Sequence, residues 1–477
     1  MQFHGKRVVI LGLARQGIAL ARYLAGQGAR VTVSDAKPAE ALSAGLTALA
    51  EYGRINASAP PIEYVLGGHP PILLDGADLL CLSGGVSADL PLAWEARRRG
   101  IPLSNDSQIF LEATPARVVG ITGSAGKTTT TTLVGLMAGS GWPRADGGGQ
   151  PTAIGNQPSA ISQRVWVGGN VGNPLLADLG EMRPGDLAVM ELSSFQLEIM
   201  TVSPHVAAVL NITPNHLDRH GTMEAYAEAK SHILRHQSSG GVAVLGLDDP
   251  GAKGLAALVR GRLVWFSRQA EVSDGAFLRS EAVMLRTDGR EHKVCDVAEI
   301  RVRGRHNVLN VLAACATSGA AGVPPEAMRQ AIGEFTGVEH RLEFVREWNG
   351  VKWYNDSIAT APERAVAAIL SFHEPIVLLA GGRDKKLPWD EFAVLVRERV
   401  KHLIVFGEAR GLIESAVRSE GYAAITLRER MADAVTAAAR IAQSGDVVLL
   451  APGGTSFDEF VDFAERGVKF REMVKAL

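Results

Sequence analysis

The strongest constraint on the fold is one stretch, Arg117 to Thr130, in which a β-branched run leads into a glycine-rich turn and then into a predicted helix. The turn runs from Gly123 to Gly126. In a strand, turn and helix of this order, backbone N–H groups and the helix dipole converge on one anion. The stretch therefore predicts a phosphate-binding loop after a strand of an α/β domain.

Two side chains complete the expected loop. Lys127 would reach the β- and γ-phosphates of a nucleotide, and the Thr128 hydroxyl would hold Mg²⁺. The strict pattern has another glycine five residues before Gly126, whereas this chain has Ile121 there, so the loop is a variant. A glycine-rich turn that carries a lysine by chance is the alternative.

Length and composition predict several domains and small-molecule partners. The chain has 477 residues, 46% of them hydrophobic, which is enough for about three cores. A net charge of −2 with evenly spread Lys and Arg gives no basic patch for nucleic acid or an acidic membrane. The cysteines, Cys81, Cys295 and Cys315, lack metal-ligand spacing and are expected to be buried, reduced thiols.

The location and assembly of the protein are also predicted from the sequence. No apolar run reaches membrane-spanning length. The first strand follows the N-terminus without a charged leader or a cleavage site. We therefore expect a cytoplasmic protein, and we expect a monomer.

The first 35 residues predict a Rossmann-like unit of strand, helix and strand. Its turn, Gly12 to Gly17, has Ala14 in place of the second glycine of GxGxxG, and Asp35 is well placed to accept ribose hydroxyls. A dinucleotide, a mononucleotide or nucleotide sugar, and no ligand at all are each compatible with this motif. In a doubly wound sheet the ligand would lie between this turn, Asp35 and residues 83–87.

Strand-like and helix-like segments alternate along the rest of the chain, which predicts an α/β fold of three domains. We place a Rossmann-like N-terminal domain at 1–115, a central P-loop ATPase-like domain at 116–336 and a C-terminal Rossmann-like domain at 337–477. The Gly- and Pro-rich residues 139–167 are expected to form a mobile surface loop. A helix at 308–320 is expected to be the last large element of the central domain.

Two residues near the loop, Glu191 and His216, are candidate metal ligands, and each has a simpler alternative. Glu191 ends an apolar strand-like run and offers the hard oxygen that Mg²⁺ prefers, although a solvent-facing cap is as common there. His216 stands in a polar loop after another strand, where a lone histidine is more often a surface residue. Lys230, on the following helix, would ordinarily be solvated.

Several motifs together resemble those of the Mur ligases. They are GITGSAGKTT at 120–129, ELSSFQLE at 191–198, the loop at 211–220, GRHN at 304–307 and HRLE at 340–343. The resemblance extends from the first strand to the last helix. ELSSFQLE and the later Asn355-Asp356-Ser357 favour the branch of the family that adds D-glutamate.

This resemblance implies an ATP-dependent ligase with one substrate for each domain. The N-terminal domain would bind UDP-N-acetylmuramoyl-L-alanine, the central domain ATP and the C-terminal domain D-glutamate. The substrate carboxylate would become an acyl phosphate, which the amine of D-glutamate then attacks. A histidine, His216, or the phosphate itself would take the proton of the amine.

The resemblance also implies the site residues. ATP would be bound by Gly123, Gly126, Lys127, Thr128, Thr129, Asn307, Arg341 and Asp356, and Mg²⁺ by Thr128, Glu191, His216 and Lys230. The nucleotide substrate would contact Gly12, Arg15, Gln16, Asp35 and Asn170, and D-glutamate would contact Thr360, Lys385, Ser456 and Phe463. Lys127, His216 and Lys230 would be catalytic, with Lys230 carbamylated so that it becomes a carboxylate-like ligand.

One position departs from the family pattern, and other functions stay open. Many relatives have lysine after Asn-Asp-Ser, where this chain has Ile358. Either Lys385 or Lys386 supplies that charge, or the contact differs.

The Rossmann-like unit is also compatible with an NAD-dependent oxidoreductase, the P-loop with an ATP-driven switch, and the whole pattern with another Mur ligase or a folate polyglutamate ligase.

Overall fold

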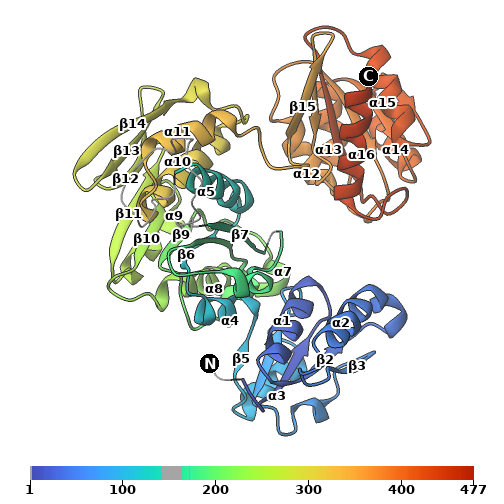
Figure 1. Ribbon diagram of the computed structural model, residues 1–477. Coiled ribbons are helices and arrows are strands. Elements are labelled where there is room, and N and C mark those ends of the chain that lie inside the picture. The colour runs from blue at the N-terminus through green and yellow to red at the C-terminus, as the bar shows by residue number, and fades with distance from the viewer. Residues whose placement is uncertain (1–2, 142–163, 171) are drawn as a thin grey trace, which may run out of the picture. The chain divides into compact units, whose positions relative to one another are not determined.

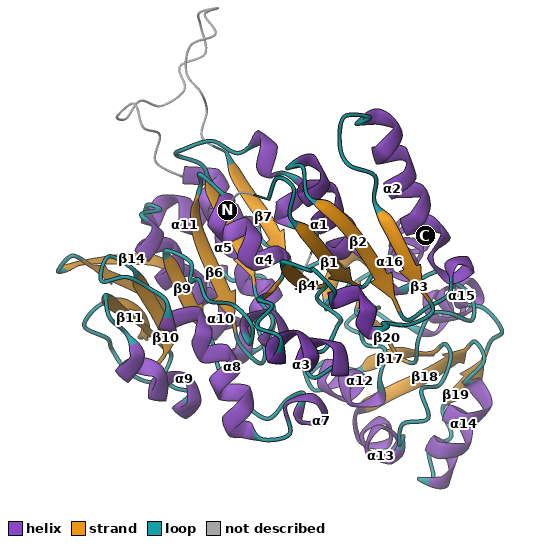
Figure 2. Cartoon of the chain, turned by 90° about the horizontal axis from the view of Figure 1, so that it is seen from below, coloured by secondary structure: helices purple, strands orange, loops and turns teal. Residues whose placement is uncertain are grey.

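The computed structural model describes residues 3–141, 164–170 and 172–477 and divides into two compact units. Unit 1 comprises Met1–Ile300 and Arg305–Glu334, and unit 2 comprises Arg301–Gly304 and Phe335–Leu477. Three mostly parallel sheets with helices against them confirm the predicted α/β class (Figures 1 and 2). None of the helices in the described ranges is long and apolar enough to cross a membrane.

The N-terminal sheet of unit 1 is parallel throughout its described strands, in the order β3-β2-β1-β4-β5. Its strands are β1 (Arg7–Leu11), β2 (Arg30–Asp35), β3 (Glu63–Leu66), β4 (Leu79–Leu82) and β5 (Leu103–Ser104). The helices of this region are α1 (Arg15–Gly26), α2 (Ser43–Ile55), α3 (Pro91–Arg98) and α4 (Asp106–Ala113). The strand order reverses between β1 and β4, and a ligand crevice is expected beyond their carboxyl ends.

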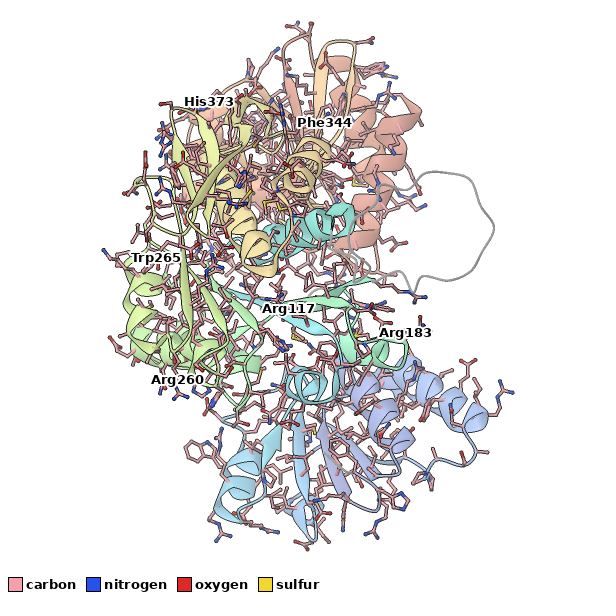
Figure 3. All side chains as sticks on the ribbon, turned by 60° about the vertical axis from the view of Figure 1, so that its left-hand side comes forward. Arg117, Arg183, Arg260, Trp265, Phe344 and His373 are labelled. Atoms are coloured by element: carbon pink, nitrogen blue, oxygen red, sulfur yellow. The ribbon has the colours of Figure 1, made fainter. Side chains whose placement is uncertain are left out.

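The central sheet of unit 1 has the order β14-β13-β12-β11-β10-β9-β6-β8-β7 over its described strands. These strands are β6 (Arg117–Thr122), β7 (Val165–Gly169), β8 (Leu187–Glu191), β9 (Val206–Val209), β10 (Val242–Gly246), β11 (Arg262–Ser267), β12 (Gly275–Arg279), β13 (Ala282–Thr287) and β14 (Arg290–Asp296). Strand β6 lies between β8 and β9 and is fully buried after Arg117. Arg117 marks its amino end (Figure 3), far along the strand from the predicted loop.

Helices surround this central sheet, and they correct two expectations. They are α5 (Lys127–Gly141), α6 (Ser194–Leu197), α7 (Leu217–His220), α8 (Met223–Arg235), α9 (Pro250–Gly254), α10 (Arg305–Ala321) and α11 (Pro325–Glu334). The helix expected at 308–320 is therefore not the last, because α11 follows it. The segment 139–167 begins inside α5 and ends inside β7, and its residues 142–163 lie outside the described part of the chain.

The antiparallel strands β12 to β14 were not predicted. At the edge of the sheet, β12 pairs with β13 and β13 pairs with β14, both in antiparallel orientation. Arg279, Arg286 and Glu291 of these strands form exposed ion pairs with one another and with Glu271 of the loop before β12. These charges interrupt the apolar runs by which the other strands were recognised.

Unit 2 contains one sheet, in the order β15-β16-β20-β17-β18-β19 over its described strands. The strands are β15 (Glu343–Trp348), β16 (Val351–Asn355), β17 (Ile376–Gly381), β18 (Val400–Phe406), β19 (Ile425–Leu427) and β20 (Val447–Gly453). The helices are α12 (Pro362–Ile369), α13 (Asp390–Arg399), α14 (Arg410–Ser419), α15 (Met431–Ile441) and α16 (Phe463–Ala476). Only β15 is antiparallel among the described pairs. Two buried apolar clusters cover the faces of this sheet.

The short segment 301–304 is fastened to unit 2 by Arg303. Its Nη1 donates to both carboxylate oxygens of Glu374, at 2.7 and 2.9 Å, and its Nε donates to the Tyr354 hydroxyl at 2.8 Å. The guanidinium also lies 5.1 and 5.3 Å from the ring centres of Tyr354 and Phe372. The chain passes between the units three times, after residues 300, 304 and 334, and Arg303 fixes the first passage to unit 2.

We expect Arg303→Met to destabilise unit 2, because the half-buried Glu374 carboxylate loses its partner. The expected loss in unfolding free energy is about 1–2 kcal/mol, measured by scanning calorimetry. Arg301→Met is the matched control, since Arg301 is exposed and its side chain forms no ion pair or hydrogen bond with the described residues. Equal shifts in the two variants would contradict a clamping role for Arg303.

Candidate active site

The strand register brings four predicted site segments to one edge of the central sheet. Ile121 of β6 pairs with Glu191 of β8, and Gly169 of β7 pairs with the same Glu191. On the other side of β6, Thr122 pairs with Val209 of β9. The loops that follow these strands therefore start side by side, and they carry the predicted phosphate-binding loop, Asn170, Glu191 and the polar loop 211–220.

Glycine is required at two positions of the phosphate-binding loop. Gly126 has φ +83°, and a Cβ there would lie 2.2 Å from Asn310 Oδ1. A Cβ on Gly123 would lie 2.9 Å from the Leu210 Cβ. Such distances leave no room for a side chain, so the loop backbone approaches its neighbours as closely as a phosphate cradle requires.

The polar loop after β9 braces the phosphate-binding loop. Ala125 N donates to Asn211 Oδ1 at 2.8 Å, and the Ser124 hydroxyl donates to the Thr213 carbonyl at 2.9 Å. Asn211 and Thr213 were not predicted to have this role. Their position directly after an apolar strand, in a segment dense in hydrogen-bonding side chains, was the signal available in the sequence.

Lys127 and Asn307 lie at this loop as predicted for an ATP site. The Lys127 Nζ donates to the Gly123 carbonyl at 2.8 Å, which folds the side chain back over the loop. Asn310 lies against Gly126 and donates to Asn307 Oδ1 at 3.0 Å. The first turns of α5, which carry Thr128 and Thr129, and of α10 thus meet at one place. No contact described here tests their roles in binding ATP.

Glu191 is a buried carboxylate with one unsatisfied oxygen. The residue is 1% exposed, and its Oε1 accepts from Asn170 Nδ2 at 3.0 Å. Its Oε2 is buried and has no hydrogen-bond partner among the described residues. A buried polar atom of this kind costs free energy unless a ligand satisfies it. The interpretation of Glu191 as a solvent-facing cap is therefore wrong. Its free carboxylate oxygen is the kind of hard ligand that Mg²⁺ prefers.

Lys230 is buried beneath the phosphate-binding loop, so the expectation of a solvated lysine is wrong. The residue is 1% exposed. Its Nζ donates to the Gly123 carbonyl at 3.0 Å and lies 4.6 Å from the centre of the Tyr226 ring. Burial lowers the Lys230 pKa well below its usual value, and the neighbouring charge of Lys127 lowers it further. A neutral amine is thereby favoured inside the site.

His216 is exposed and is supported by an aromatic residue of ELSSFQLE. Its backbone is left-handed, with φ 53°, at the start of α7. Its ring meets the Phe195 ring at 5.2 Å, and Phe195 stacks on His220 at 5.0 Å. Arg219 lies 4.8 Å from the same phenyl ring. Phe195 had no predicted role of its own, and its membership of the ELSSFQLE motif was the sequence signal available.

A crevice joins the N-terminal turn to Asn170. It is lined by Arg15, Gln16, residues 83–85, Gly169 and Asn170, together with neighbouring backbone. Gly12 has φ +96°, and a Cβ on Gly17 would lie 1.9 Å from the Gly12 carbonyl oxygen. The backbone therefore still requires the first and third glycines of the motif, although alanine replaces the second.

Side chains across this crevice are already ordered by hydrogen bonds. Gln16 Oε1 accepts from Gly84 N at 2.7 Å, and Arg15 Nη1 donates to the Gly172 carbonyl at 3.1 Å. Asp35 accepts from Leu13 N at 2.8 Å. Asp35 thus braces the turn, and its predicted contact with a nucleotide stays a prediction.

In unit 2, Arg341 and Asp356 are neighbours near the end of β16. Asp356 is buried and accepts from Leu342 N at 3.0 Å. Burial raises the Asp356 pKa to about 6, against the opposing charges of Arg341 and Arg364. His340 and Leu342 have φ 63° and 43°, so the backbone on both sides of Arg341 is held in the left-handed region.

Three of the residues predicted for D-glutamate, Thr360, Lys385 and Ser456, lie on loops after β16, β17 and β20, and the fourth, Phe463, begins α16. Lys385 Nζ donates to the Thr360 hydroxyl at 3.1 Å. Burial lowers the Lys385 pKa, and Arg364 adds to this effect. Ser456 is buried, and Phe463 is partly exposed with its ring 6.3 Å from His340.

Arg466 is a fully buried cation that sequence reasoning missed. Its guanidinium donates to the Ser357 hydroxyl and carbonyl, at 3.0 and 2.8 Å, and to the Gly454 carbonyl at 3.1 Å. Burial lowers the Arg466 pKa to about 10. It ties the loop after β16 to the loop after β20, and its helical position gave no sign of this.

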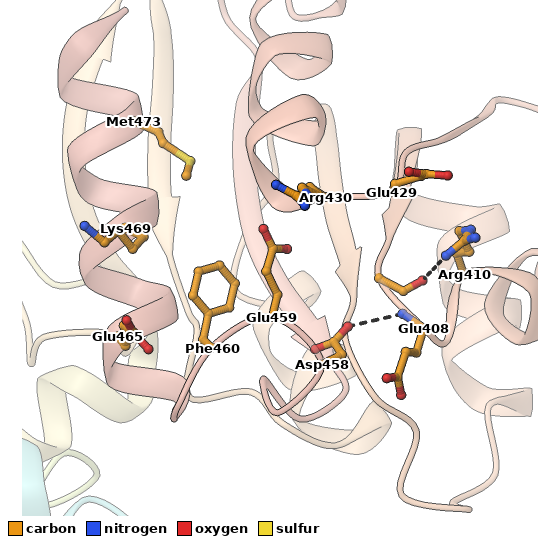
Figure 4. Close-up of a pocket in the computed structure, with 11 residues that line it drawn as sticks. Glu408, Arg410, Glu429, Arg430, Asp458, Glu459, Phe460, Glu465, Lys469 and Met473 are labelled. Carbon is orange, nitrogen blue, oxygen red and sulfur yellow. Dashed lines mark hydrogen bonds between the residues drawn. The ribbon is translucent and has the colours of Figure 1, made fainter.

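A separate hollow in unit 2 contains none of the predicted site residues (Figure 4). Most of its carboxylates already have structural partners: Asp458 accepts from Glu408 N at 3.1 Å, and Glu459 accepts from Met431 N at 3.1 Å. Glu408 also forms an ion pair with Arg383. These bonds indicate a structural role for this cluster.

Comparison with protein-family models assigns all three regions to one family. The Mur ligase MurD-like N-terminal domain matches residues 6–105, the Mur ligase middle domain residues 121–318, and the Mur ligase glutamate ligase domain residues 340–454.

Curated relatives match over their full length. One is the UDP-N-acetylmuramoylalanine--D-glutamate ligase of Symbiobacterium thermophilum, 44% identical over 99% of this chain and 98% of that protein. The protein of the same name from Pelotomaculum thermopropionicum is 39% identical over 100% and 98%. Among solved structures, UDP-N-acetylmuramate-alanine ligase MurC from Thermotoga maritima has a TM-score of 0.56 at 19% identity, over 99% of this chain and 100% of that one, which shows a shared fold.

We expect Gly126→Ala to weaken ATP binding by about tenfold or more, because the added Cβ strains a left-handed backbone and collides with Asn310. Equilibrium titration with a fluorescent ATP analogue measures this. Gly139→Ala is the matched control, since Gly139 lies in α5 with no heavy atom within 4 Å of the added methyl. Unchanged affinity in Gly126→Ala would contradict the predicted cradle.

Proposed function

Because the chain belongs to the Mur ligase family, we propose that it adds D-glutamate to UDP-N-acetylmuramoyl-L-alanine in an ATP-dependent step of peptidoglycan precursor synthesis. The observation that carries this proposal is the convergence of three groups at one sheet edge. Lys127 folds over the glycine loop, Glu191 has a buried unsatisfied oxygen, and the buried Lys230 amine contacts the same loop. That combination fits the activation of a carboxylate by a nucleoside triphosphate.

The reaction needs ATP because a carboxylate does not react with an amine at neutral pH. Its leaving group would be oxide. The carboxylate of UDP-N-acetylmuramoyl-L-alanine attacks the γ-phosphate, which forms an acyl phosphate and releases ADP. The amine of D-glutamate then attacks the acyl carbon, and the tetrahedral intermediate collapses to an amide and phosphate.

The residues of the central region are proposed to bind and orient the triphosphate. The loop from Gly123 to Thr129 cradles the phosphates, Lys127 compensates their charge, and Asn307 holds the adenine. Thr128, Glu191, His216 and carbamylated Lys230 would hold Mg²⁺. When bound, Mg²⁺ would reduce the repulsion between the anionic reactants.

The remaining residues are proposed to position the other two substrates. Gly12, Arg15, Gln16, Asp35 and Asn170 bind the nucleotide substrate. In unit 2, Thr360, Lys385, Ser456 and Phe463 bind D-glutamate, and Arg341 and Asp356 contact ATP. Ordering the reactants supplies much of the acceleration in a reaction of three substrates. We propose a cytoplasmic monomer that acts without nucleic acid or membrane.

Phosphate release by the purified protein tests the activity. With UDP-N-acetylmuramoyl-L-alanine and ATP, we expect release only when D-glutamate is added, and not with L-glutamate, L-alanine or D-alanine. Release that needs no amino acid would favour an ATP-driven switch. Preference for another acceptor would indicate a different ligase of this family, and binding of NADH without release would favour an oxidoreductase.

Carbamylation of Lys230 is tested by ¹³C NMR with labelled bicarbonate. Only the neutral amine reacts with CO₂, and the Lys230 pKa lies well below the usual 10.5. We therefore expect one carbamate signal near neutral pH, which weakens as falling pH protonates the amine. The signal should vanish in Lys230→Ala and persist in Lys253→Ala, a control on α9. A signal that survives Lys230→Ala would contradict the assignment.

A further inference from the structure

We propose that unit 1 contains a second small-molecule site, on the side of α1 that faces α2, and that it takes a flat aromatic anion. The site is a hollow between α1, α2 and the two short 3-10 helices at Leu175–Ala177 and Leu179–Glu181. This inference goes beyond the proposed function, which uses a different crevice.

The lining of the hollow selects the charge of its ligand. Twelve described residues line it, and none of them is Asp or Glu. Two are arginines, Arg15 and Arg22 of α1. A lining with two cations and no carboxylate favours an anion, because nothing within it compensates the guanidinium charges.

The same lining favours an aromatic ligand. Tyr23 of α1 and Tyr52 of α2 present rings to the hollow, while Ile18 and Leu176 supply apolar surface. Neither phenol hydroxyl has a hydrogen-bond partner in the described part of the chain. Burial raises the pKa of both phenols, so both hydroxyls stay protonated and can donate. Flat rings with an acidic group match this set of aromatic faces and donors.

The hollow is distinct from the crevice proposed for the nucleotide substrate. The two share only Arg15 and Pro174 among their lining residues. Arg22 and Tyr52 line the hollow alone. Arg22 uses its Nη2 on the Ala48 carbonyl, at 2.9 Å, which fixes the side chain beside α2 while other N–H groups remain for a ligand.

Arg15 gives the two sites a physical connection. Its Nη1 donates to the Gly172 carbonyl, at 3.1 Å, in the segment that borders the nucleotide crevice. An anion in the hollow would bind the remaining N–H groups of the same guanidinium and so alter its position at the crevice. Occupancy of the hollow therefore changes the affinity of the crevice, and by linkage the nucleotide changes the affinity of the hollow by the same factor.

The test is a fluorescence titration of the full-length protein with 8-anilinonaphthalene-1-sulfonate, an aromatic anion that brightens in apolar surroundings. We expect saturable binding that weakens about five- to tenfold in Arg22→Ala and in Tyr52→Leu. Tyr52→Phe should keep most of the affinity, because it keeps the ring. Arg54→Ala and Tyr64→Ala are matched controls outside the hollow, and both should bind as the unchanged protein does.

Two comparisons decide the outcome. As UDP-N-acetylmuramoyl-L-alanine is added, the dissociation constant of the dye should change and then level off. Complete competitive displacement of the dye would overturn the proposal, because it would place the dye in the substrate crevice. Equal weakening in the hollow variants and the controls would also overturn it. Arg22→Ala and Tyr52→Leu should retain phosphate release with D-glutamate, which shows that they are folded. The dye titration is done without ATP, so its result does not depend on the proposed ligase activity.

Discussion

The contact between the Lys230 amine and the Gly123 carbonyl is the interaction on which the candidate site depends. It is possible only because α8 brings a lysine under a loop whose glycines leave no space for side chains. Burial and the nearby charge of Lys127 both disfavour an ammonium there, and the opposite charge of Glu191 offsets only part of that cost. The neutral form avoids that cost, so the packing of one helix against one loop determines the chemistry of the amine.

The α/β fold and most of the site at the central sheet follow from local sequence patterns. Apolar β-branched runs predicted β6, β8 and β9, and parallel strands place their following loops at a common edge. The order of motifs along the chain then indicated which residues meet. The antiparallel edge strands β12 to β14 were not predicted because charged side chains on their exposed face divide their sequences into short apolar runs.

The sequence could not predict which charged side chains are buried or which residues they contact. Glu191, Lys230 and Arg466 are residue types that are almost always exposed unless paired, and nothing local marks them as buried. Their burial results from long-range packing: Lys230 meets a loop more than one hundred residues away, and Arg466 meets Ser357 at a similar separation. Asn211 was visible as a polar residue after a strand, but its bond to Ala125 depends on the neighbouring strand.

The unsatisfied oxygen of Glu191 and the buried amine of Lys230 each cost the protein free energy of folding. Each group carries a cost in the free protein, which the proposed ligands would remove: Mg²⁺ would satisfy the carboxylate, and carbamylation would convert the amine into a second anionic metal ligand. Apolar side chains at these two places would make a more stable protein that binds no metal. If the proposed ligands bind there, the site sacrifices folding stability for ligand affinity, and their binding would stabilise unit 1 by mass action.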